Sequence, residues 1–89
     1  MLICEVIGHV WATKKEETLN GMKLMIVRQL KTDGTPLPDT FVAADKVCAG
    51  IGDQVLVVSG STARRAMGSH EPPVDAAIVG IIDSVEVKA

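Results

Sequence analysis

Short apolar runs, separated by glycine, proline and charged residues, cover most of this 89-residue chain. Runs that are rich in β-branched residues and bounded by turn residues are typical of β-strands. The pattern predicts five strands, at residues 2–13, 22–30, 41–44, 54–59 and 76–87. Gly8 and Gly80 fall inside the first and last of these strands, where we expect a bend or bulge.

The segments between the predicted strands carry turn signals. Residues 14–17 form a charged run that indicates a solvated turn, and Pro38 favours an irregular connection before the third strand. Ser61 is predicted to cap a short helix that runs to Met67 and ends at Gly68. A break at 71–73, Glu-Pro-Pro, separates this helix from the last strand.

Short strands, interior glycines and one small helix together indicate an all-β fold. The prediction is a five-stranded OB-like barrel with one short α-helix, and an open two-layer sheet is the alternative. A chain of 89 residues forms a single domain, spanning residues 1–89. Such a domain buries only about 60–65% of the surface that its unfolded form exposes.

The composition of the chain indicates that its subunits associate with one another. Hydrophobic residues make up 47% of the chain, yet it contains one Phe, one Trp and no Tyr. That is more aliphatic surface than a small monomer buries, so part of it is expected to lie between subunits. Trp11 is accordingly interpreted as a core or interface plug.

Targeting signals and metal ligands are sparse. The longest apolar runs fall far short of the roughly 18 residues that span a bilayer, and the N-terminus lacks signal-peptide features, so we expect a cytosolic protein. Cys4 and Cys48 are predicted to be buried thiols, because a cytosolic location argues against a disulfide. His9 and His70 lie far apart and no C-x-x-C occurs, so neither a metal site nor a cofactor is expected.

Residues 50–65 invite a catalytic interpretation that fails on spacing. A dinucleotide fingerprint needs a strand before its glycines, whereas Gly50 and Gly52 precede one, and Val55 occupies the third glycine position. No Gly-Lys-Ser/Thr follows to make a phosphate-binding loop, and Ser61 lacks the second glycine of a nucleophile elbow. With no base near Ser61 in sequence, we predict no catalytic residues and no enzyme.

Arg64 and Arg65 lie close to the start of the predicted helix, where positive charge opposes the helix dipole. A buried carboxylate that pairs with Arg64 would offset this cost. The candidate partners are Asp45, Asp75 and Asp83.

Seven motifs in this order resemble the EutN/CcmL family of bacterial microcompartment vertex proteins. They are Gly8-x-Val10-x-Ala12-Thr13-x-Lys15, Leu19-x-Gly21-x-Lys23-Leu24, Asp33-Gly34, Val42-Ala43-x-Asp45, Val47-x-Ala49-Gly50-x-Gly52, the run from Val55 to Arg64, and the run from Pro73 to Asp83. None of these motifs is specific by itself, but their order covers nearly the whole chain.

This resemblance implies a structural shell protein. It implies an OB-like barrel that assembles into a homo-pentamer, occupies the five-fold vertices of a polyhedral shell in the bacterial cytoplasm, and meets hexameric shell proteins. A subunit interface or axial loop is then expected at Ala49, Gly50, Gly52, Ser61, Arg64 and Asp83. No nucleic acid or membrane partner is expected.

Two positions depart from the family pattern. Cys48 stands where glycine is usual, and Asp53 stands where Glu is usual. If the backbone at position 48 has a positive φ, Cys48 is strained there.

A nucleic-acid-binding module is the alternative function. OB-like barrels that bind single strands combine a basic groove with stacking aromatic residues. A net charge of −2, with one Trp and one Phe, argues against this alternative.

Overall fold

The computed structural model of this chain describes residues 1–13, 17–19, 21–68 and 73–88. Lys14, Lys15 and Glu16 of the predicted charged turn, His70, and Glu71 and Pro72 of the predicted break lie outside the described residues. In chain order the elements are β1 (Leu2–Val10), a 3-10 turn η1 (Glu17–Leu19), β2 (Lys23–Leu30), β3 (Pro36–Asp45), β4 (Gln54–Ser59), α1 (Gly60–Ala66) and β5 (Ala76–Ile81).

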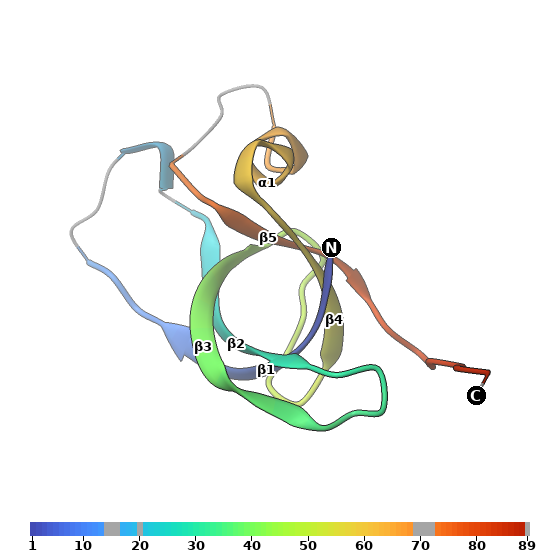
Figure 1. The fold of residues 1–89 in the computed structure, drawn as a ribbon. Coiled ribbons are helices and arrows are strands. Elements are labelled where there is room, and N and C mark those ends of the chain that lie inside the picture. Colours follow the sequence, from blue (N-terminus) through green and yellow to red (C-terminus); the bar gives the residue numbers. More distant parts are fainter. Residues whose placement is uncertain (14–16, 20, 69–72, 89) are drawn as a thin grey trace.

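The five strands close into a barrel in the order β1-β2-β3-β5-β4 (Figure 1). β4 pairs with β1 to complete the ring, and every pairing is antiparallel except the one between β3 and β5. This arrangement confirms the predicted five-stranded OB-like barrel and removes the open two-layer sheet from consideration.

The barrel core follows from the two-residue repeat of the strands, which turns alternate side chains inward. Within β1 and β2 the inward positions include Cys4, Val6, Met25 and Val27, all of them buried. They pack with Ala43, Ala49, Val55, Val57, Ala76 and Ile78 in one cluster. A smaller cluster lies under α1, where Ala63 packs on Val58 and Ala77.

Both predicted bends occur as irregularities of the ladders. The pairing of β1 with β2 shifts register between Val6 and Gly8, and that of β4 with β5 shifts between Leu56 and Val57, opposite Gly80. An extra residue on one strand increases the local twist, which small closed barrels need.

Three strand predictions were wrong in length. β1 ends at Val10 rather than at residue 13. β3 begins at Pro36 rather than Phe41, because Pro38 falls in a register shift of the β2–β3 ladder and interrupts no regular pair. β5 ends at Ile81 rather than at residue 87. The segment beyond has no hydrogen-bonding partner strand in the described chain, although Val85 and Val87 continue the alternation.

This last segment, residues 83–88, is called the C-terminal arm below. It leaves the barrel on the side opposite β3 and ends away from it (Figure 1). The chain measures 46 × 23 × 21 Å and has a radius of gyration of 13.1 Å, against about 12 Å for a compact chain of this length. The arm therefore belongs to the projecting part of the molecule.

Candidate subunit-interface surfaces

The loop that joins β3 to β4, residues 45–53, is held from within by one carboxylate. The Asp45 side chain is fully buried and accepts hydrogen bonds from the N–H of Val47 at 2.9 Å and of Ala49 at 2.7 Å. These bonds replace the ladder partners that the backbone lacks after the end of β3. Residues 45–53 are called the anchored loop below.

Lys23 completes this arrangement from the neighbouring strand. It lies opposite Asp45 in the β2–β3 register, with Nζ at 3.6 Å from Asp45 Oδ2. The same Nζ donates to the carbonyl of Ala49 at 2.7 Å. One lysine thus ties both ends of the Asp45–Ala49 turn, and the buried carboxylate has a positive partner close by.

The second half of the anchored loop is fastened to β1. Gly50 N–H donates to Asp53 Oδ2 at 2.8 Å, and Asp53 N–H donates back to the Gly50 carbonyl at 3.0 Å. Gly52 and Asp53 then exchange two hydrogen bonds with Val6, at 2.8 and 2.9 Å. Gly52 has φ +95°, a backbone conformation that favours glycine. Asp53, a departure from the family pattern, therefore closes the turn with its own carboxylate.

Cys48 lies in the left-handed region with φ +61°, as the sole non-glycine residue of the described chain with a positive φ. The condition set from the sequence is met, so Cys48 is strained at a position where the family has glycine. The prediction that this thiol is buried was wrong, since Cys48 is exposed. Its neighbour Ala49, in contrast, is fully buried.

Cys4 behaves as predicted. It is a free, fully buried thiol in β1. Burial raises its pKa from 9.0 to about 11, because an apolar surrounding disfavours the thiolate. Cys4 is consequently an inert core residue rather than a reactive one.

The helix at the other end of β4 corrects one prediction. α1 begins at Gly60 with Ser59 as its N-cap, so Ser61 is an exposed residue of the first turn and not the cap. No side chain caps this helix, and Gly60 N–H instead bonds to the carbonyl of Asp75 at 2.8 Å. The predicted end at Met67 and Gly68 is confirmed, with Gly68 at φ +118°.

Arg64 lies half-buried on α1, in its last turn rather than near its start, so the predicted conflict with the helix dipole was wrong. Across the described residues, the ion pair between Lys23 and Asp45 is the one that forms, so Asp45 is engaged elsewhere and is not a partner of Arg64 within the chain. Asp75 and Asp83 are both exposed. The expected pairing of Arg64 with a carboxylate stays a prediction, and it requires a second chain or a movement of these side chains.

The six site residues predicted from sequence fall in two places. Ala49, Gly50 and Gly52 belong to the anchored loop, and Asp83 lies near its end because Ile82 N–H bonds to the carbonyl of Gln54 at 2.8 Å. Ser61 and Arg64 lie on α1, at the opposite end of β4. The structure therefore brings four of the six together and separates them from the helix pair by the length of one strand.

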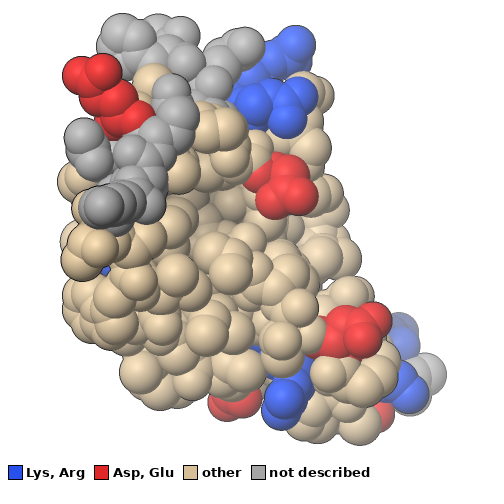
Figure 2. Space-filling model, turned by 90° about the vertical axis from the view of Figure 1, so that its left-hand side faces the viewer, with Lys and Arg blue, Asp and Glu red and all other residues tan. Residues whose placement is uncertain are grey.

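Two sides of the barrel carry uncovered apolar residues. A hollow of about 210 Å³ is lined by Leu19, Leu24, Val42, Ala44 and the segment from Pro73 to Ala76. These residues come from η1, β2, β3 and the start of β5, which lie on the left of the barrel in Figure 1. Figure 2 shows this face, which is largely free of charged side chains between the groups near its top and bottom. On the other side, exposed Ile81, Val85 and Val87 continue from β5 into the C-terminal arm. These two surfaces agree with the interface expected from composition.

Sequence reasoning missed the Lys23–Asp45 anchor, and one of its two alternatives for Trp11, a core residue, was wrong. Both anchor residues stand in the quoted family motifs, and the register of two adjacent strands would have placed them opposite each other. Trp11 is 85% exposed and stacks on His9 with ring centroids 5.2 Å apart, so it is not a core plug. Its interface role is untested.

Chemical sites are scarce in the part of the chain that the structure describes. Within it, no group of three or more His, Cys, Asp or Glu side chains is placed to hold a metal ion. Its one α-helix is also far too short to cross a membrane.

Known proteins match this chain along nearly its whole length. The family model for "Ethanolamine utilisation protein EutN/carboxysome" matches residues 1–83. The carboxysome shell vertex protein CcmL of Thermosynechococcus vestitus is 48% identical over 85 residues, which cover 96% of this chain and 86% of the relative.

Two solved structures extend the match to the fold. CcmL of Gloeobacter violaceus superposes with a TM-score of 0.92 at 44% identity, covering 98% of this chain and 90% of the other. The pentameric microcompartment shell protein GrpN of Rhodospirillum rubrum does so with a TM-score of 0.89 at 42% identity, covering 98% and 100%. With the motifs, the barrel and these matches in agreement, the chain belongs to the EutN/CcmL family.

Proposed function

We propose that this chain is a structural shell protein that forms a homo-pentamer at the five-fold vertices of a bacterial microcompartment. The observation that carries the proposal is the end-to-end match with a pentameric shell protein, over a barrel with the same elements. The named relatives are carboxysome and microcompartment shell vertex proteins, which places the proposed assembly in the bacterial cytoplasm.

The physical task of such a protein is to close a surface. Tiles with six-fold symmetry form a flat sheet, and a closed polyhedron needs five-fold positions. A ring forms when two different patches on each chain meet head to tail and the rotation closes on itself. The two uncovered apolar sides of this barrel supply two such patches.

Hexameric shell proteins are the proposed partners at the rim of the ring. We propose no catalytic role, because the anchored loop uses its carboxylates and amides to hold its own backbone. That accounts for Asp45 and Asp53, which are the acidic side chains nearest the glycine-rich turn.

Nucleic acid and membrane partners are not part of the proposal. A barrel that binds single strands needs a continuous basic groove. On the face in Figure 2 the basic groups stand at the top and near the bottom, and acidic groups and a broad uncharged area lie between them. Fluorescence polarisation with labelled single strands should therefore show no salt-sensitive binding.

Co-expression with a hexameric shell protein tests the function directly. We expect closed particles by electron microscopy when this chain is present, and open sheets or tubes when it is omitted. Closed particles of the same shape without this chain, or open assemblies in its presence, would contradict the proposal.

A further inference from the structure

We propose that the C-terminal arm of one subunit binds along the exposed edge of β3 in the next subunit of the ring. The inference rests on the proposed pentamer and deepens it by assigning the contact that joins neighbouring chains. It starts from the two parts of the described barrel that lack a partner for their main-chain groups.

The first of these is the outer edge of β3. Lys46 N–H donates to the Ile78 carbonyl at 3.2 Å, which shows that even-numbered residues here direct their main-chain groups toward β5. The β2–β3 register is regular from Asp45 to Thr40, so the alternation holds along this stretch. Because β5 pairs with β3 only at Ala44 and Asp45, the groups of Val42 and Thr40 face an unpaired edge.

The second is the arm itself. Its backbone is extended, and no hydrogen bond joins residues 83–88 to the rest of the described chain, the last one being that of Ile82. In an extended segment the two-residue repeat puts Val85 and Val87 on one face, and Ser84, Glu86 and Lys88 on the other. Val87 is 63% exposed. The sequence pattern is that of a strand, but the segment has no hydrogen-bonded partner strand in the described chain.

The edge of β3 is bordered by apolar space of suitable size. A hollow of about 430 Å³ is lined by Leu2, Phe41, Val42, Ser59, Asp75 and Ala76. It adjoins the smaller hollow described above, since both share Val42, Asp75 and Ala76. A strand that adds to a sheet edge makes main-chain hydrogen bonds to that edge and places every second side chain in neighbouring pockets. Val85 and Val87 are spaced two residues apart, as this mode of binding requires.

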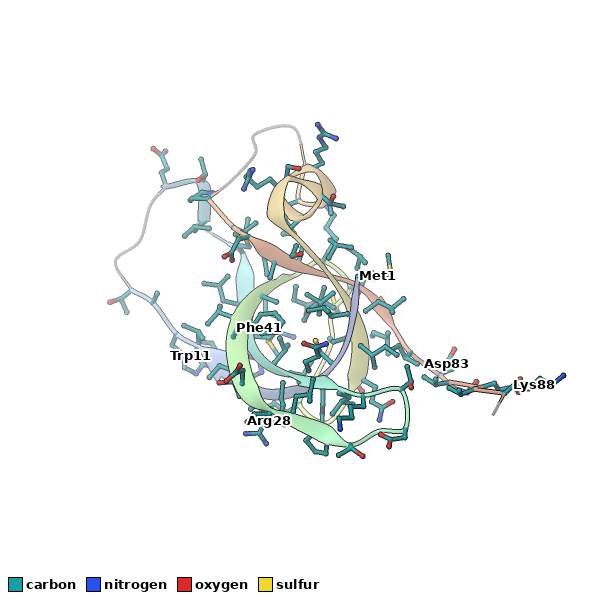
Figure 3. All side chains as sticks on the ribbon, viewed as in Figure 1. Met1, Trp11, Arg28, Phe41, Asp83 and Lys88 are labelled. Carbon is teal, nitrogen blue, oxygen red and sulfur yellow. The ribbon has the colours of Figure 1, made fainter. Side chains whose placement is uncertain are left out.

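The occupant is a second copy because of where the two parts lie. Figure 3 shows Asp83 and Lys88 along the arm on one side of the barrel, while Phe41 lies on β3 on the other side. The arm therefore points away from the edge of its own β3. Two different surfaces on opposite sides, each completing the other, form a head-to-tail contact, which is the kind that closes a ring.

Disulfide trapping tests the contact. In a Cys48→Ser background, Val42→Cys and Val87→Cys together should give a ladder of covalent oligomers up to five chains under mild oxidation. Each single cysteine variant should give none beyond a dimer. The matched control pairs Val87→Cys with Thr62→Cys, an exposed residue on α1, and should give no ladder. A ladder that is equally strong with Thr62→Cys would overturn the inference.

A charge placed on the arm gives a second, independent test. Val85→Asp with Val87→Asp should weaken the ring at least roughly tenfold by native mass spectrometry, because burial of two valines is lost. Ser84→Asp, on the opposite face of the arm, should leave the ring unchanged. Circular dichroism should show an intact barrel in the wild-type protein and in both variants.

The outcomes separate the inference from the proposed function. A ring that persists in the double aspartate variant, with no disulfide ladder, would overturn the arm contact and leave the pentamer standing. A wild-type protein that stays monomeric would contradict the pentamer itself and remove the arm contact with it.

Discussion

The anchored loop and the C-terminal arm are both irregular segments of the same small barrel, yet they are held in opposite ways. In the loop, the Asp45 carboxylate, Lys23 and the Gly50–Asp53 turn bond the backbone to itself and to β1. In the arm, no such bond joins residues 83–88 to the described chain. The loop finds its hydrogen-bond partners within one subunit, whereas the arm has no such partner in the described chain.

This difference indicates which part of the sequence serves the fold and which serves assembly. Buried polar groups need partners, and the loop supplies them locally. Exposed apolar side chains, such as Val85 at 41% and Val87 at 63%, indicate an interface instead. Stability of the monomer should accordingly respond to changes in the loop, and ring formation to changes on the uncovered sides.

The largest expected effect comes from removing the carboxylate that holds the anchored loop. Asp45→Ala removes two hydrogen bonds to a buried charge and leaves the Val47 and Ala49 N–H groups unpaired, so the free energy of unfolding should fall by about 4 kcal/mol. Urea denaturation followed by circular dichroism measures this. Asp39→Ala, which removes an exposed carboxylate from the same strand, should change it by less than about 0.5 kcal/mol. Equal effects of the two substitutions would show that the loop is not anchored as described.

The next effect concerns assembly. Arg64→Ala should weaken the ring by about 3 kcal/mol per interface if Arg64 pairs with a carboxylate of a neighbouring chain. Dilution of the protein with native mass detection reports this change. Arg65→Ala on the exposed side of α1 serves as the control. Rings of unchanged stability in Arg64→Ala would rule out that role for Arg64.

A smaller effect comes from the buried thiol. The pKa of Cys4 is about 11 in the folded chain against 9.0 for an ordinary thiol, so above pH 9 the unfolded state loses this proton first. Stability should therefore be unaffected by Cys4 below that pH and fall as the pH rises from 9 to 11, by on the order of 2 kcal/mol. Cys4→Val should lack this part of the pH dependence. Superimposable pH profiles for the two proteins would contradict the assignment.

The smallest expected effect concerns the strained backbone at Cys48 in the anchored loop. Cys48→Gly should stabilise the chain by about 1 kcal/mol, because glycine adopts φ +61° without the cost that a side chain brings. Thermal unfolding would show this as a rise in Tm. Cys48→Ala keeps a Cβ at the same φ and should give no such gain. A lower Tm for Cys48→Gly would mean that the Cys48 side chain makes a stabilising contact.

Much of the fold could be predicted because the strands obey local rules. The apolar run from Val55 to Val58, bounded by turn residues, gave the bounds of β4, and the interior Gly8 and Gly80 marked two register shifts. The resemblance to the EutN/CcmL family correctly predicted the barrel. Because the family pattern has glycine at position 48, it also indicated that the backbone there could have the positive φ that the structure shows.

What failed depends on groups that meet only in three dimensions. β5 was predicted too long because Val85 and Val87 carry a strand pattern, while the absence of a partner strand is not written in the local sequence. Ser61 was predicted as the N-cap because its type is right, but the helix begins two residues earlier than that prediction implies, with Ser59 as the N-cap and Gly60 as the first helical residue. Asp45 was named as one of three candidate partners of Arg64, although the β2–β3 register places it opposite Lys23.

The proposal that this barrel is a building block for a five-fold vertex is tested most directly by the native mass of the purified protein across a dilution series. The account predicts a dominant species of five chains that dissociates to monomers without a stable intermediate ring. A protein that stays monomeric at every concentration, or one that forms a ring of a different number of chains, would contradict it.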